Sequence, residues 1–218
     1  MGLICSCESV LPNLIDVSCP EDMDQIVKMA FQLVQADAPF DSVDSIGLAN
    51  SWNTLLAASG ATKITLSPAL HNVVVPASEG NFTGEDSNES VNGVGFYLGE
   101  NIIKVSGEIV SAPQAVVDAM DQLSCFSDAT LGQSKLTAYF FLRRIKGISR
   151  VVAKAGTVAG DYSGFEIFNF RISSPDNAGY NTKTKYMWSF TMQPDEWKSR
   201  ELVNLDFNPL ALANVATT

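Results

Sequence analysis

One stretch near the C-terminus, from 165 to 192, limits the folds open to this chain more than any other. Residues 182–192 alternate between apolar and polar side chains, which is the period of two that a half-buried strand requires. One face of this strand would carry Tyr186, Trp188, Phe190 and Met192, and the other Lys183, Lys185, Ser189 and Thr191, with Met187 as the exception. The turn-forming residues 173–179 separate it from a second apolar run at 165–172. The pattern predicts a long antiparallel hairpin whose aromatic face packs against the rest of the fold.

Length and composition favour a single β-rich domain. The chain has 218 residues, and 46% of them are hydrophobic, which is enough for a packed core. Further strand-like runs lie at 62–75, 94–98, 102–110 and 134–153, with a turn expected at Gly99-Glu100-Asn101. We therefore predict an α+β fold that is mainly β, an antiparallel β-sandwich or barrel. The domain would span 18–203, between an N-terminal arm at 1–17 and a C-terminal arm at 204–218.

Two helices are expected to flank the sheets, at about 18–36 and 112–124. Each is preceded by a capping-box pattern, Ser18-x-x-Glu21 in the first case and Ser111-x-x-Gln114 in the second. The first would present an apolar stripe of Met23, Ile26, Val27, Ala30, Phe31 and Val34, and the second a stripe of Val116, Val117, Met120 and Leu123. Both stripes indicate helices that dock on a sheet or on a neighbouring subunit.

Charge argues against nucleic acid and membrane surfaces as tightly bound partners. The formal net charge is −10, and only 14 residues are Lys or Arg. Proteins that bind duplex DNA tightly neutralise its phosphates with a basic patch, and anionic lipid surfaces attract basic segments in the same way. No apolar run approaches the length of a membrane helix, so no membrane anchor is expected. The first residues lack the pattern of a secretory signal, and we expect the four cysteines to be reduced thiols of a protein made in the cytoplasm.

The sequence contains no convincing catalytic or metal-binding pattern. The single histidine, His71, lies in an apolar run with no acid beside it in sequence. Cys5-x-Cys7 lacks the second pair that a zinc site needs. We therefore predict that the chain is not an enzyme and uses no cofactor and no metal ion.

Residues 77–95 differ in composition from the rest of the chain. They are rich in Gly, Ser and Asn and contain four acidic residues but no basic one. A loop of this length inside a compact domain usually has a function or lacks fixed structure. We predict contacts between subunits through this loop and the two arms. The candidate residues are Glu79, Asn81, Phe82, Glu85, Asp86, Asn88 and Glu89 in the loop, Leu3, Ile4 and Leu11 in the N-terminal arm, and Phe207 and Leu210 in the C-terminal arm.

The order of these elements resembles the tail tube family of tailed bacteriophages and its relatives in contractile injection systems. The stretches that carry the resemblance are the strand and long loop at 72–95, the strand and helix at 102–123, and the closing strands at 134–153 and 165–193. The resemblance implies a virion protein, made in the host cytoplasm, whose subunits form hexameric rings that stack into a hollow tail tube. Its partners would be further copies and other tail proteins, and DNA would pass through an acidic conduit during ejection without specific binding.

Two other interpretations remain open. The chain could be another virion β-protein, such as a connector or a head or tail completion protein. It could also be a β-barrel module that binds a small apolar ligand or a peptide. The second interpretation predicts a pocket lined by Phe168, Phe170, Tyr186, Trp188 and Phe190.

Overall fold

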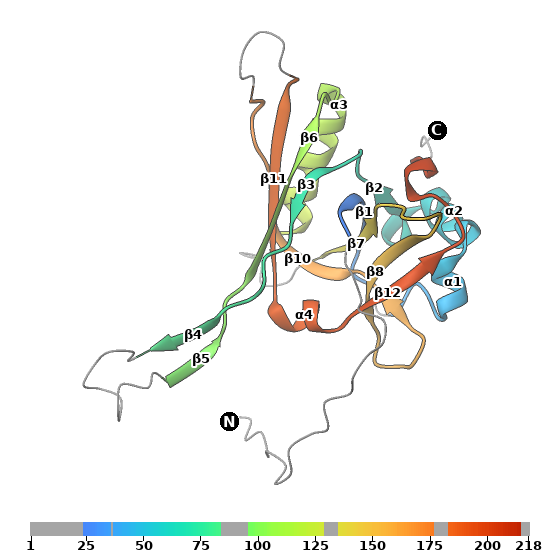
Figure 1. Ribbon diagram of the computed structural model, residues 1–218. Helices are drawn as coiled ribbons and strands as arrows, with labels where there is room; N and C mark the ends of the chain where they lie inside the picture. The colour runs from blue at the N-terminus through green and yellow to red at the C-terminus, as the bar shows by residue number, and fades with distance from the viewer. Residues whose placement is uncertain (1–23, 36, 84–95, 129–134, 177–182, 215–218) are drawn as a thin grey trace.

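The computed structural model describes residues 24–35, 37–83, 96–128, 135–176 and 183–214. Figure 1 shows a body of crossing strands flanked by helices, from which a narrow arm of two strands extends. The strands are β1 (Ile26–Leu33), β2 (Ile64–Leu66), β3 (His71–Val74), β4 (Gly80–Thr83), β5 (Phe96–Glu100), β6 (Ile103–Val110), β7 (Leu136–Leu142), β8 (Ser149–Ala155), β9 (Tyr162–Ser163), β10 (Phe165–Ile172), β11 (Lys185–Met192) and β12 (Arg200–Leu205). The helices are α1 (Val43–Gly47), α2 (Ala49–Ala57), α3 (Gln114–Asp121) and α4 (Pro194–Lys198), with 3₁₀ turns η1 (Gly60–Thr62), η3 (Gln122–Phe126) and η5 (Pro209–Ala211).

Strand β7 organises the body. Antiparallel β1 pairs along one edge of β7, whereas the other edge is divided between β10 at one end and β8 at the other. Sheet A is the layer β12-β8-β7-β1-β2, with β9 added to β8. Sheet B is the layer β10-β11-β6-β3, which β10 joins to sheet A. The described strands form an antiparallel sandwich and not a closed barrel, and the predicted mainly-β, α+β fold class is confirmed.

The main core lies between the two sheets and contains the aromatic face of the predicted hairpin. Strands β10 and β11 pair antiparallel, as predicted. Phe170, Trp188 and Phe190 are at most 1% exposed and pack with their neighbours in one apolar cluster. The rings of Phe170 and Trp188 lie 6.4 Å and 5.8 Å from that of Phe190. These side chains fill a core, so they do not form the ligand pocket that the binding-module interpretation required.

Strand β10 belongs to both sheets because its backbone bends at Asn169. The φ angle of Asn169 is +56°, a region that asparagine tolerates better than most residues, and the pairing register shifts between Phe168 and Arg171. Buried Ser127 holds this bend from the end of η3. Its carbonyl oxygen accepts the N–H of Asn169, and its hydroxyl oxygen accepts the N–H of Phe170 at 2.9 Å. The bend therefore redirects the aromatic hairpin from sheet A into sheet B.

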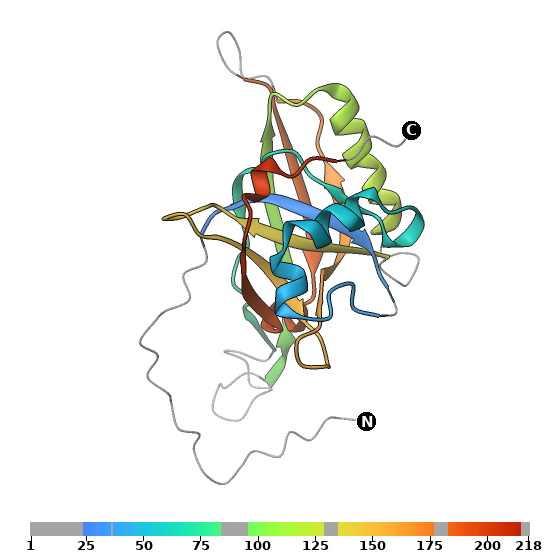
Figure 2. The ribbon, with the colours of Figure 1, turned by 90° about the vertical axis from the view of Figure 1, so that its right-hand side faces the viewer.

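The outer face of sheet A is covered by α1, α2 and the C-terminal segment, as Figure 2 shows. Trp52 of α2 is fully buried, and its ring centroid lies 4.7 Å from Phe40, 5.3 Å from Tyr139 and 4.9 Å from Phe141. Its indole N–H donates to the carbonyl of Ile46 at 2.7 Å, so the buried polar atom is satisfied. Strand β7 is consequently buried on both of its faces.

The described part of the C-terminal segment packs on its own chain. The amine of Lys28 donates to the carbonyl of Leu212 at 2.5 Å. The side-chain amide of Asn214 accepts the Leu66 N–H at 2.7 Å and donates to the Leu66 carbonyl at 3.0 Å. The bonds from Asn214 cap the outer edge of β2, which among the described strands pairs only with β1. Only residues 215–218 of the predicted C-terminal arm lie outside the described residues.

Of the two predicted helices, one is confirmed and one is wrong. Helix α3 with η3 occupies the stretch predicted at 112–124, and Val117 and Met120 of its apolar stripe are buried. The stretch predicted as a helix at 18–36 instead contains strand β1, whereas residues 18–23 lie outside the described residues. Strand β1 is packed on both faces, so its apolar residues do not alternate, and the resulting run also matched a helical period.

Candidate functional site

The feature that stands apart from the body is the arm formed by β4 and β5. The two strands pair only with each other among the described strands, from Gly80 opposite Glu100 to Thr83 opposite Phe96. Figure 1 shows β3 continuing into β4, and β5 continuing into β6, along one line. The predicted turn at Gly99-Glu100-Asn101 is therefore wrong, since β5 does not fold back on β6.

The arm exposes apolar side chains. Tyr97 and Leu98 of β5 lie where the pairing register with β4 shifts, and they are 58% and 62% exposed. Phe82 and Ile102 are 48% and 57% exposed. Within the arm, the rings of Phe82 and Tyr97 lie 5.4 Å apart. An isolated two-stranded hairpin is marginally stable in water, and this one presents apolar surface that its own chain does not cover.

An ion pair fastens the base of the arm to α4. The amine of Lys198 contacts the carboxylate of Glu100 and lies 3.5 Å from that of Asp195. The hydroxyl of Ser78 also donates to Glu100, at 2.7 Å. The hydrogen bonds from Lys198 and Ser78 lower the pKa of Glu100, and the bond to Glu100 raises the pKa of Lys198. The arm is thus anchored at its base by charged contacts, while its far end extends away from the body.

The outer face of sheet B is a second surface that no described helix covers. It carries the polar side predicted for β11, with Lys185 and Met187 exposed and Ser189 and Thr191 half-buried. Neighbouring strands add Lys104, Ser106, Glu108, Arg171 and Asn72. Glu108 accepts from Lys185 and from the amide of Asn72, both at 3.1 Å. Three basic side chains and one acidic one lie here, so this face would not form the acidic conduit wall that the resemblance implies.

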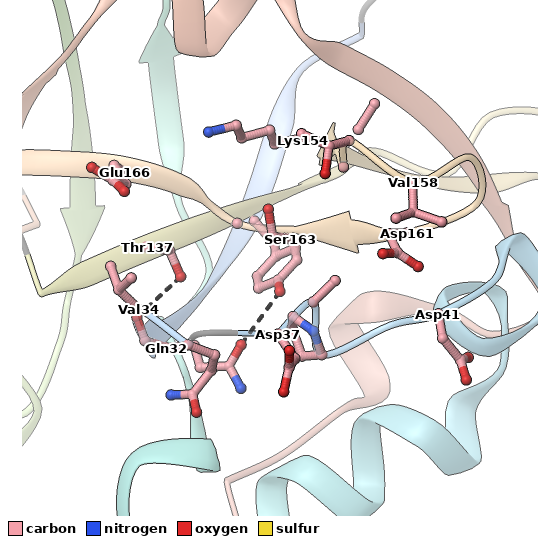
Figure 3. Close-up of a pocket in the computed structure, with 18 of the residues that line it drawn as sticks. Gln32, Val34, Asp37, Asp41, Thr137, Lys154, Val158, Asp161, Ser163 and Glu166 are labelled. Atoms are coloured by element: carbon pink, nitrogen blue, oxygen red, sulfur yellow. Dashed lines mark hydrogen bonds between the residues drawn. The ribbon is translucent and has the colours of Figure 1, made fainter.

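A hollow of the body, shown in Figure 3, lies beside the end of β1 and the β8–β9 connection. It has a volume of about 570 Å³ and is lined by the carboxylates Asp37, Asp41, Asp161 and Glu166. The one lysine in its lining, Lys154, already pairs with Glu196 of α4 at 2.6 Å. This charge distribution favours a cationic group over an anion.

The polar groups of this cavity show no catalytic arrangement among the described residues. Burial raises the pKa of the Tyr139 phenol, so the phenol stays protonated, and it donates to the side chain of Gln32 at 3.3 Å. The Thr137 hydroxyl donates to the Gln32 carbonyl at 3.1 Å. No histidine or cysteine lies among the residues that line the cavity. In the part of the chain that the structure describes, no group of three metal-ligating side chains comes together.

The structure places some of the predicted contact residues in the arm and others elsewhere. Glu79, Asn81 and Phe82 lie at the start of the arm or on β4, and all three are exposed. Phe207 packs on the apolar cluster between sheet A and the helices that cover its outer face. Leu210 in η5 is 52% exposed. The predicted contact residues outside the described part of the chain are Glu85, Asp86, Asn88, Glu89, Leu3, Ile4 and Leu11.

The sequence analysis missed Tyr97, Leu98 and Ile102 as surface residues. They follow the acidic stretch directly and form an apolar group beside it, which was the available signal. The region 94–110 was predicted to form two strands of the domain, because a sequence does not show whether a strand packs on a core or projects from it.

Comparison with known proteins adds no relative: no family model, no curated protein and no solved structure matches the chain. None of the helices within the described ranges has the length and apolar character needed to cross a membrane.

Proposed function

We propose that this chain is a structural protein of a tailed-phage virion, a tail tube subunit that assembles into stacked homomeric rings. The rings, hexameric by resemblance, form the conduit through which DNA leaves the virion. The protein is made in the host cytoplasm and works in the virion tail. Its partners are further copies of itself and other tail proteins, and its assembly requires no cofactor.

The observation that carries this proposal is the arm, whose apolar side chains are exposed. Tyr97 and Leu98 are neighbours on β5, and each is more than half exposed. Antiparallel strands commonly pack one face on a core. Apolar surface of this kind on a projecting hairpin is typical of a segment that a partner covers.

The uncovered face of sheet B supports the same proposal. Its side chains are mostly polar and of mixed charge, and two of its strands, β3 and β6, continue into the arm. A subunit with one covered sheet and one open sheet can meet its neighbours through the open sheet. The same features would suit a connector or a completion protein of the virion, which also assembles into rings.

Electron microscopy and sedimentation velocity of the purified protein over a wide concentration range test the proposal. The expected result is rings with a central channel that stack into tubes as the concentration rises, in buffer containing a chelator. Single rings that never stack would favour the connector. A protein that remains monomeric at all concentrations, and that forms no rings in virions, would overturn the proposal.

A further inference from the structure

The turn between β7 and β8 carries an unusual concentration of positive charge. Four of the chain's 14 basic residues, Arg143, Arg144, Lys146 and Arg150, fall within eight positions, and no acidic residue interrupts them. Arg143, Arg144 and Lys146 are exposed, and Arg150 is half-buried. Arg143 pairs with Asp24 at 3.3 Å. For the other three, no carboxylate of the described residues lies within ion-pair distance.

This turn is held in one shape. Ile145 and Ile148 exchange both backbone hydrogen bonds, at 3.0 Å and 2.9 Å, so the loop between them has only two residues. Lys146 and Gly147 both have positive φ, +49° and +86°, as in the tight turns that match the twist of a hairpin. The Arg144 side chain donates to the Gly147 carbonyl at 2.9 Å.

The turn also exposes apolar surface. Ile145 and Ile148 are 44% and 48% exposed and flank the basic residues. In Figure 2 the turn projects from the left side of the body, while the arm extends below it, so the two features are separate on one subunit. A surface that combines cations with exposed isoleucines fits a partner that is both acidic and partly apolar.

The chain itself contains such a segment. From Glu79 to Ile102 it has five acidic residues and no basic one, and residues 84–95, which connect β4 to β5, carry Glu85, Asp86 and Glu89. Apolar residues of the arm, Phe82 and Tyr97 among them, stand on either side of this connection. The connection joins β4 to β5, and these two strands form the arm that extends away from the body.

We propose that the β7–β8 turn, residues 143–150, is the docking surface for the acidic connection 84–95 of a second copy. Opposite charges select and orient this contact, and the exposed isoleucines cover apolar residues of the arm. The inference rests on the proposed function, because it assumes that copies of the chain assemble. Nucleic acid is the other polyanion that the turn could meet, but a chain of net charge −10 repels it, and phosphates would leave the isoleucines uncovered.

Charge reversal on both sides tests the pairing. The variants are Arg144→Glu/Lys146→Glu in the turn, Glu85→Lys/Asp86→Lys in the connection, and the four changes combined. Each double variant is expected to raise the protein concentration at half-assembly by about tenfold or more, since two attractions become repulsions. The combined variant restores opposite charges and is expected to return to within a few-fold of the unaltered chain.

The matched control is Lys63→Glu/Lys135→Glu, which changes the net charge as much as the turn variant does. Both lysines lie at the end of sheet A opposite the turn, beside the start of β2 and of β7. The control is expected to assemble like the unaltered chain, and thermal unfolding by circular dichroism confirms that each variant is folded.

Three outcomes would overturn the inference. If the unaltered chain assembles and the turn variant assembles equally well, the docking surface is wrong while the proposed function stands. If the turn variant assembles normally but loses binding to a duplex DNA probe, the turn is a nucleic-acid surface. If the unaltered chain never assembles, both proposals fail.

Discussion

Removing the apolar side chains of β5 should weaken assembly without weakening the fold. In the variant Tyr97→Ser/Leu98→Ser, two side chains that are 58% and 62% exposed lose their apolar surface. Full burial of a side chain of this size stabilises a complex by roughly 1.5–3 kcal/mol, so covering the exposed part should contribute about 1–1.5 kcal/mol per residue. The variant should therefore lose about 2–3 kcal/mol per contact between subunits, which corresponds to about a 30- to 140-fold weaker association.

Sedimentation velocity over a concentration series measures this loss as a shift in the midpoint of assembly. The control Val43→Ser/Val158→Ser removes side chains that are 52% and 63% exposed but lie outside the arm. Its midpoint should not move, and the melting temperatures of both variants should stay close to that of the unaltered chain. If the midpoint is unchanged in the arm variant, or moves equally in the control, the arm does not mediate contact and the reasoning fails.

Three further predictions concern the fold and its charges. Gly164→Ala should lower the free energy of unfolding in urea by about 1–3 kcal/mol, because the added carbon would lie 2.8 Å from Thr137 in the β7–β10 crossing. Lys28→Met should remove part of the pH dependence of the free energy of unfolding. Burial lowers the pKa of Lys28, so the unfolded chain binds this proton more strongly than the folded chain does. The unaltered protein should therefore gain stability relative to the variant as pH rises towards 10.5. A flat difference between the two would contradict this. Lys198→Met should raise the pKa of Glu100 towards its usual value, measured by carboxyl NMR; in the unaltered protein this contact should hold at neutral pH and be lost as pH falls below 4.5.

Sequence patterns predicted the strands of sheet B better than those of sheet A, because one face of sheet B is exposed to solvent. One face of β11 meets water, so apolar and polar residues alternate and the strand can be read directly. Helix α3 likewise has one face exposed to solvent, so its apolar stripe identified it as a helix. Strand β1 lies in sheet A, where α2 and the C-terminal segment cover one face and sheet B covers the other. Apolar residues therefore lie on both faces of β1, and their pattern in sequence does not separate a buried strand from a buried helix.

The arm was hard to predict for the opposite reason. The neighbouring residues Tyr97 and Leu98 of β5 are both exposed, so burial imposes no period on this strand. The composition of 77–95 identified the region as unusual, and Glu79, Asn81 and Phe82, which were predicted there as contact residues, are exposed. The pairing of β4 with β5 depends on residues far apart in the sequence, and neither the arm's direction nor the separate position of the basic turn could be inferred from local pattern.

The charge of the arm also bears on the symmetry of any assembly. In a two-fold dimer that joined arm to arm, the segment 79–102, which has five acidic residues and no basic one, would meet its own copy, and Lys198 of α4 pairs with one of the five, Glu100. Like charges placed together in this way oppose association. A contact from the arm of one copy to a different surface of the next avoids the repulsion, and it leaves the pair with one unused arm and one unused acceptor surface. Contacts of this heterologous kind propagate until a ring closes or continue as an open stack. The arm's acidity therefore selects against a simple dimer and favours the repeating assembly that a tube requires.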